Sequence, residues 1–126
     1  MLEAYSLNTT VAAGSAVPFN NITLKKGNTA CLNGVATIEL NKCGVYMIEV
    51  NASSATASTI QLYRDEVALP QAQSTGTSPS FTTLVQVPSN NNPDCCCTSP
   101  VTLQVKNAGT ASATFTDVNV VVTKVC

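Results

Sequence analysis

Residues 44–52 read GVYMIEVNA, and this stretch decides the class of fold. Successive side chains of a β-strand point to opposite faces, so Tyr46, Ile48 and Val50 share one face. Met47 and Glu49 lie on the other face. One apolar face and one mixed face are typical of an antiparallel sheet that is wet on one side. The stretch therefore predicts a half-buried strand.

Similar short runs recur about every ten residues along the chain. They are rich in β-branched residues, they are separated by Gly, Asn, Pro or Ser, and none shows helical apolar spacing. This spacing indicates a sandwich or barrel, and 126 residues with a mass of 13.1 kDa suit one domain. We predict a single domain over residues 1–126, an all-β antiparallel two-sheet jelly-roll sandwich. It has about ten strands, at 4–7, 16–19, 22–24, 35–40, 45–52, 58–64, 67–73, 81–87, 101–106 and 113–125.

The run at 113–125 is apolar on both sides. Val118, Val120 and Val122 fall on one face, while Phe115 and Val121 add apolar area to the other. A strand that is apolar on both faces is buried on both, and only one face of a two-layer sandwich meets the core. We expect the second face to meet another subunit, with a covering loop of the same chain as the alternative.

Composition excludes several classes of function. Only 10% of residues are charged, the net charge is −1, and the six basic residues are scattered, so no nucleic-acid footprint is present. No apolar run approaches the ~18 residues of a membrane span. The first 19 residues lack the features of a secretory signal, so we expect synthesis in a cytoplasm. Low charge also favours hiding part of the surface against another chain.

The chain carries no recognisable catalytic apparatus. It has no histidine, the commonest general base. Its seven carboxylates form no evident acid/base pair, and neither a phosphate-binding loop nor a nucleophile elbow is present. We predict a protein that is not an enzyme and that uses no cofactor.

Six cysteines are the most unusual feature of the composition. Because loops alternate between the two ends of a sandwich, we expect five of them at one end: Cys43, Cys95, Cys96, Cys97 and Cys126. These five are our disulfide candidates. Cys31 is expected at the opposite end, about 25 Å of strand from Cys43 at ~3.3 Å per residue, beyond the reach of a disulfide. Reduced thiols and a soft-metal site are the alternatives. We predict no metal, because zinc sites favour Cys-x₂₋₄-Cys pairs and histidine.

Several motifs in order resemble one known group of domains. Gly44-Val45-Tyr46-Met47-Ile48 matches the Gly-x-Tyr-x-apolar signature of tumour-necrosis-factor-like and complement-globular-head jelly rolls. Residues 11–19 (VAAGSAVPF) resemble the beginning of their bacterial and phage versions. Residues 103–107 (LQVKN) followed by 118–125 resemble the ending. The similarity covers nearly the whole chain and resides in the order and spacing of the motifs.

The resemblance implies a homotrimer packed around a threefold axis. Our candidates for the trimer interface are Phe115, Val121 and Tyr46. Related heads occur in phage fibre or decoration proteins and in collagen-like spore-surface proteins. Here neither a collagen repeat nor heptads precede the domain, which favours a free decoration subunit.

The leading hypothesis is a structural protein of a phage virion surface, either a capsid decoration protein or a fibre head, with a capsid or fibre protein as its partner. One alternative is a receptor- or carbohydrate-binding head for a surface glycan. Such sites favour exposed aromatic side chains, for which Tyr5, Tyr63 and Phe81 are the candidates. Another alternative is a structural protein of a bacterial cell or spore surface.

Overall fold

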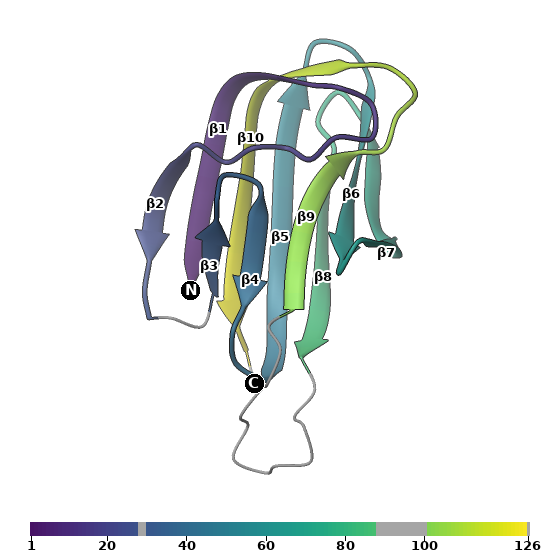
Figure 1. The fold of residues 1–126 in the computed structure, drawn as a ribbon. Coiled ribbons are helices and arrows are strands. Elements are labelled where there is room, and N and C mark those ends of the chain that lie inside the picture. Colours follow the sequence, from purple (N-terminus) through teal and green to yellow (C-terminus); the bar gives the residue numbers. More distant parts are fainter. Residues whose placement is uncertain (28–29, 88–100, 126) are drawn as a thin grey trace.

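A computed structural model describes residues 1–27, 30–87 and 101–125. These residues form two five-stranded antiparallel sheets, packed face to face (Figure 1). Sheet A has the strand order β2-β1-β10-β5-β8, and sheet B has the order β3-β4-β9-β6-β7. The predicted all-β jelly-roll sandwich is confirmed. The strands are β1 (Leu2–Val11), β2 (Asn21–Lys25), β3 (Ala30–Asn33), β4 (Thr37–Leu40), β5 (Gly44–Ser54), β6 (Ser58–Arg64), β7 (Val67–Gly76), β8 (Ser80–Val87), β9 (Val101–Asn107) and β10 (Ala113–Lys124).

The predicted strand at residues 16–19 is wrong. Val17 and Phe19 are buried, but the segment's one ladder contact is an isolated bridge between Ala16 and Lys106. The Val17 amide donates to the Val105 carbonyl of β9 at 2.7 Å, and the Phe19 amide donates to the Val35 carbonyl in the β3–β4 turn at 2.6 Å. Pro18 between them has no N–H to donate. The segment therefore anchors the link between β1 and β2 without joining a ladder.

The structure contains one short strand that the sequence did not predict, β3. It forms a hairpin with β4, in which Cys31 pairs with Glu39 and Asn33 pairs with Thr37. Gly34, in the connection, adopts a positive φ of 77°, a conformation that favours glycine. The run predicted at 35–40 is consequently shorter, because Val35 belongs to the turn.

Both sheets contribute alternating side chains to one continuous core. Tyr46 is the largest buried residue, and its hydroxyl donates to the Lys42 carbonyl at 2.6 Å. Burying this ring is compatible with stability because its polar end is hydrogen-bonded. Other large buried side chains are Phe19, Phe115, Leu2, Ile38, Leu40, Ile48, Ile60, Leu62 and Leu103.

The prediction that Phe115 faces outward is also wrong. The register between β10 and β5 shifts between Phe115 and Asp117, which marks a β-bulge. One extra residue reverses the alternation, so Phe115 shares the inner face with Val118 and is fully buried. On the neighbouring strand, Asn8 stands at the same level with a positive φ of 50°.

The sandwich has two distinct ends, which we call the base and the apex (Figure 1). The base holds both chain termini and the ends of β4 and β8. The apex, at the top of Figure 1, holds the link that follows β1 and the β5–β6 and β9–β10 connections.

Asn107, the last residue of β9, ties the apex together. Its side-chain nitrogen donates to the carbonyls of Val11 and Ala111, both at 3.0 Å, and its side-chain oxygen accepts the Gly109 amide at 3.0 Å. Its own backbone bonds Gly14 and Ser15. One buried residue thus satisfies polar groups from two separate loops.

Candidate functional site

The outer face of sheet A is the surface best suited to contact another molecule. The antiparallel registers place Glu3, Val121 and Glu49 side by side, and Thr123, Met47 and Leu84 side by side in the next row. We use the name outer face of sheet A for the outward side chains of Glu3, Tyr5, Leu7, Asn119, Val121, Thr123, Val45, Met47, Glu49, Asn51, Thr82, Leu84 and Gln86.

Apolar side chains occupy the middle of this face. Leu84 is 61% exposed, while Val121 and Met47 are half-buried. Val121 therefore lies outward, as the sequence predicted. Large apolar side chains gathered on one outward sheet face mark a surface for association more often than scattered single residues do.

The outer face of sheet A is acidic. Glu3 and Glu49 flank Val121 on the two neighbouring strands. The side chain of Asn51 donates to Glu49 at 3.2 Å and to the side-chain oxygen of Asn119 at 3.4 Å. None of the side chains that define the outer face of sheet A is a lysine or arginine, although the exposed Lys25 and Lys124 belong to β2 and to the end of β10 in the same sheet. A partner for this surface has to tolerate or neutralise these carboxylates.

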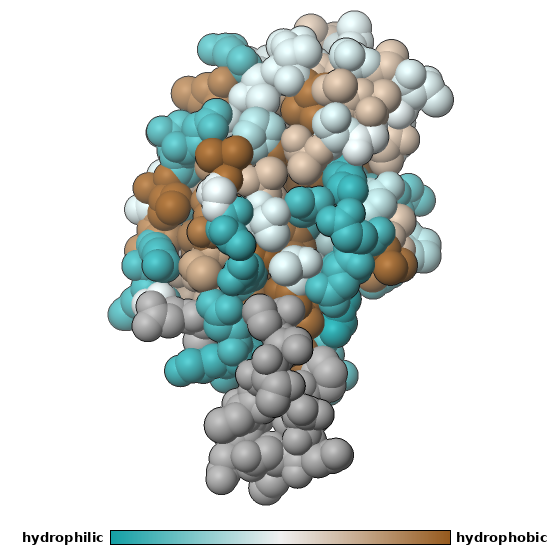
Figure 2. Space-filling model, in the orientation of Figure 1, coloured by the Kyte–Doolittle hydropathy of each residue, from teal (hydrophilic) through white to brown (hydrophobic). Residues whose placement is uncertain are grey.

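The outer face of sheet B has a different character. Gln104 donates to the Thr37 hydroxyl at 2.9 Å, and the Lys106 ammonium lies 4.6 Å from the ring centre of Tyr63 and 3.5 Å from Glu66. Hydrophilic side chains run down this side of the molecule in Figure 2, where sheet B faces the viewer. Among the exposed large apolar side chains of the strands, Leu7, Ile22, Leu24 and Leu84 belong to sheet A and Val67 belongs to sheet B.

The interface candidate Tyr46 does not belong to a surface. It is fully buried within one chain, as Phe115 is, so neither side chain is available to a second subunit. Tyr46, Ile48 and Val50 point inward from β5. Met47, the next residue after Tyr46, points outward. Of the three interface candidates, only Val121 stays on an outward face.

The three aromatic residues proposed for glycan contact are not brought together. Tyr5 points outward from sheet A, Tyr63 points outward from sheet B beneath Lys106, and Phe81 packs against the core. All three are half-buried. They form no shared aromatic platform.

The structure corrects the position of Cys31. Because β3 and β4 form a hairpin, Cys31 lies opposite Glu39 at the same end of the sandwich as Cys43. The Asn41 side chain donates to the Cys31 sulfur at 3.3 Å. The prediction placed Cys31 at the opposite end because it treated residues 31–40 as one straight segment.

Cys43 is buried at the base, and both it and Cys31 are free thiols. Its neighbour Gly44 pairs with Val87, and Leu40 pairs with Val101. The strand ends that flank residues 88–100 thus lie close to Cys43. The other disulfide candidates, Cys95, Cys96, Cys97 and Cys126, lie outside the described residues, so their bridging stays a prediction.

Within the described ranges, no group of three or more metal-ligating side chains could hold an ion. The same part of the chain contains no helix long and apolar enough to cross a membrane.

Sequence reasoning missed the role of Asn107 and the exposure of Leu84. The alternation in residues 81–87 places Leu84 on the opposite face of the strand from Val85 and Val87, and this pattern could have predicted its outward position. Asn107 carries no comparable signal, because its three partners come from loops whose approach the sequence does not reveal.

Comparison with known proteins identifies the fold. No protein-family model matches the chain, and no curated protein matches it. Among solved structures, it resembles the PRD1 vertex protein P5, with a TM-score of 0.66 and 12% identity over 99% of this chain and 96% of that one. It also resembles the globular domain of zebrafish complement 1qA, with a TM-score of 0.69 and 12% identity over 95% and 94%. Murine APRIL matches with a TM-score of 0.54 and 10% identity over 98% of each chain. The chain has the jelly-roll fold of tumour-necrosis-factor-like and complement-head domains.

Proposed function

We propose that this chain is a non-enzymatic structural protein of a phage virion surface, and that it assembles as a homotrimer through the outer face of sheet A. The observation that carries the proposal is an apolar patch on an outward sheet face, formed by Met47 and Leu84 in one row and Val121 in the next. A structural role in a particle is supported by the likeness of the fold to a vertex protein.

Burial of this apolar patch would supply part of the association energy. Full burial of a leucine side chain contributes about 1.5–3 kcal/mol, so covering the exposed part of Leu84 contributes roughly 1 kcal/mol per copy. The carboxylates of Glu3 and Glu49 oppose close approach of identical copies, unless cations or basic side chains lie beside them. Salt screens such repulsion, so association should strengthen as ionic strength rises.

Light scattering of the purified chain tests the trimer directly. We expect a species near three times 13.1 kDa, about 39 kDa. Leu84→Glu adds a charge to the apolar patch and should give a 13.1 kDa species. Val35→Glu changes an aliphatic residue that is 53% exposed in the β3–β4 turn, and should leave the mass unchanged. A wild-type monomer at micromolar concentration would refute the assembly.

A second experiment tests the proposed location on the virion surface. Antibodies against the chain should label the surface of intact particles in electron micrographs. Complete, purified particles that contain none of this chain would refute the virion role while leaving the trimer standing.

A further inference from the structure

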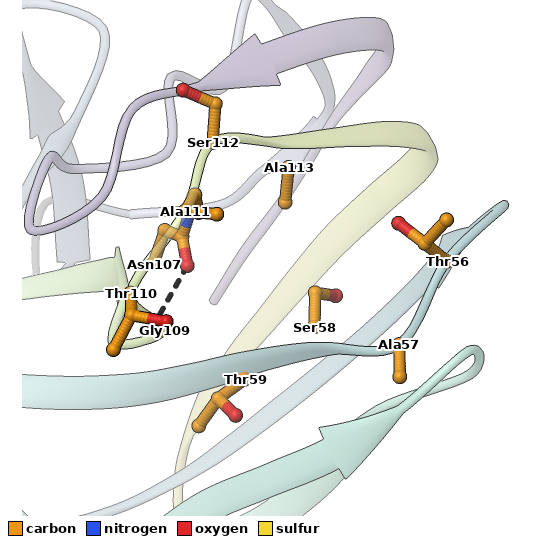
Figure 3. A pocket seen from close by; sticks show the side chains of 10 residues that line it. All are labelled: Thr56, Ala57, Ser58, Thr59, Asn107, Gly109, Thr110, Ala111, Ser112 and Ala113. Carbon is orange, nitrogen blue, oxygen red and sulfur yellow. Dashed lines mark hydrogen bonds between the residues drawn. The ribbon is translucent and has the colours of Figure 1, made fainter.

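A polar cavity opens at the apex, away from the outer face of sheet A. It has a volume of about 250 Å³ and lies between the stretch from Thr56 to Thr59 and the loop from Asn107 to Ala113 (Figure 3). At about 30 Å³ per water molecule, it offers room for roughly eight waters. This is the size of one small ligand, below the ~300–1,000 Å³ of sites for drug-sized molecules.

The floor of the cavity is formed by the buried residues Ser58, Asn107 and Ala113. The hydrogen bonds around Ser58 fix its chemistry. Ser54 donates its single hydroxyl proton to the Thr56 carbonyl at 2.6 Å. In the 3.0 Å contact between the Ser54 and Ser58 hydroxyls, Ser58 must therefore be the donor. Its proton is used, and its oxygen lone pairs remain as acceptors.

Asn107, like Ser58, offers the cavity a hydrogen-bond acceptor. Both protons of its side-chain amide are donated, to the carbonyls of Val11 and Ala111. Its oxygen accepts the Gly109 amide and keeps a second lone pair. The floor thus offers hydrogen-bond acceptors, which favour a ligand that donates.

The rim adds hydroxyl groups that can both donate and accept. Thr56, Thr110 and Ser112 are exposed and line the opening. None of the lining residues is charged or aromatic, and the upper part of Figure 2 shows the pale colours of weakly polar residues. An ion would find no opposite charge here, whereas a neutral molecule with several hydroxyls would match the groups of both floor and rim.

We propose that the apex cavity binds one neutral sugar unit, with its hydroxyls donating to Ser58 and Asn107 and exchanging hydrogen bonds with the rim. The methyl groups of Ala111 and Ala113 supply the apolar contact that a sugar ring needs. The cavity lies at the end of the sandwich opposite both chain termini (Figure 1). The inference does not rest on the proposed function, because the cavity is complete within one chain.

Nuclear magnetic resonance of the full chain tests the proposal. Amide spectra are recorded while methyl glycosides of neutral hexoses and of N-acetylhexosamines are added up to about 100 mM. We expect at least one glycoside to shift the Gly109, Thr110 and Ala111 amides, with a Kd near 1–10 mM, as suits a small and open site. Sulfate and methylammonium are the ionic comparison ligands.

Three variants locate the binding. Thr110→Val removes a rim hydroxyl at nearly constant shape and should weaken binding several-fold. Ala111→Phe fills the opening and should abolish it. Thr116→Val makes the same chemical change at an exposed position outside the cavity and should have no effect.

The proposal is overturned if no glycoside shifts these amides at 100 mM. It is equally overturned if the ions shift them more strongly than the sugars do, or if Ala111→Phe binds as well as the wild type. Because these signals are read at the apex, all three results are independent of the measured oligomeric mass.

Discussion

Replacing Asn107 by alanine should produce one of the largest losses of stability available from a polar residue in this protein. The side chain is 1% exposed and makes three hydrogen bonds of 3.0 Å each. A typical intramolecular hydrogen bond contributes about 0.5–1.5 kcal/mol net, so their loss costs roughly 3 kcal/mol. The Val11 carbonyl would also lose a buried partner, which raises the cost further.

Urea denaturation followed by circular dichroism measures this change, since the chain has no tryptophan to report it. With a urea dependence of about 2 kcal/mol per molar, a loss of 3 kcal/mol lowers the midpoint by about 1.5 M. Protein concentration must be held fixed, because subunit association adds to apparent stability.

Asn33→Ala is the matched control. Asn33 is exposed, and its side-chain nitrogen donates to the Glu39 carboxylate at 2.7 Å. Surface changes of this kind usually fall within about 0.5 kcal/mol. If Asn107→Ala shifts the midpoint no further than Asn33→Ala does, the argument that Asn107 holds the apex together is refuted.

Three further predictions follow from local geometry. Phe115→Ala should cost about 3–5 kcal/mol in thermal or urea unfolding, because the bulge puts this ring in the core; a cost below about 1 kcal/mol would place it outside. Glu66→Gly should stabilise the protein by roughly 0.5–1 kcal/mol, because Asp65 and Glu66 both have positive φ in the β6–β7 turn. The exposed ion pair between Glu66 and Lys106, which this change removes, contributes little to stability. Nonreducing gels after thiol blocking should show disulfide-linked species that Cys43→Ser leaves unchanged, because Cys43 is a free thiol; a fully reduced chain would contradict the disulfide prediction.

Local alternation was sufficient to predict most of the fold. Residues 58–64 were predicted as a strand and form β6 with the same limits. The outward position of Met47 and Glu49 also followed from the pattern around Tyr46. These predictions succeed because side-chain direction in a regular strand depends on residue number alone.

Only the tertiary structure decided where that rule breaks. A single extra residue in β10 moved Phe115 from the outer face to the core, and the β3–β4 hairpin brought Cys31 to the end that holds Cys43. The sequence by itself determined an all-β sandwich with a mixed outer face on β5. The bulge, the hairpin and the apex cavity depend on which distant strands and loops meet, and those long-range contacts leave no periodic signal in the residues that make them.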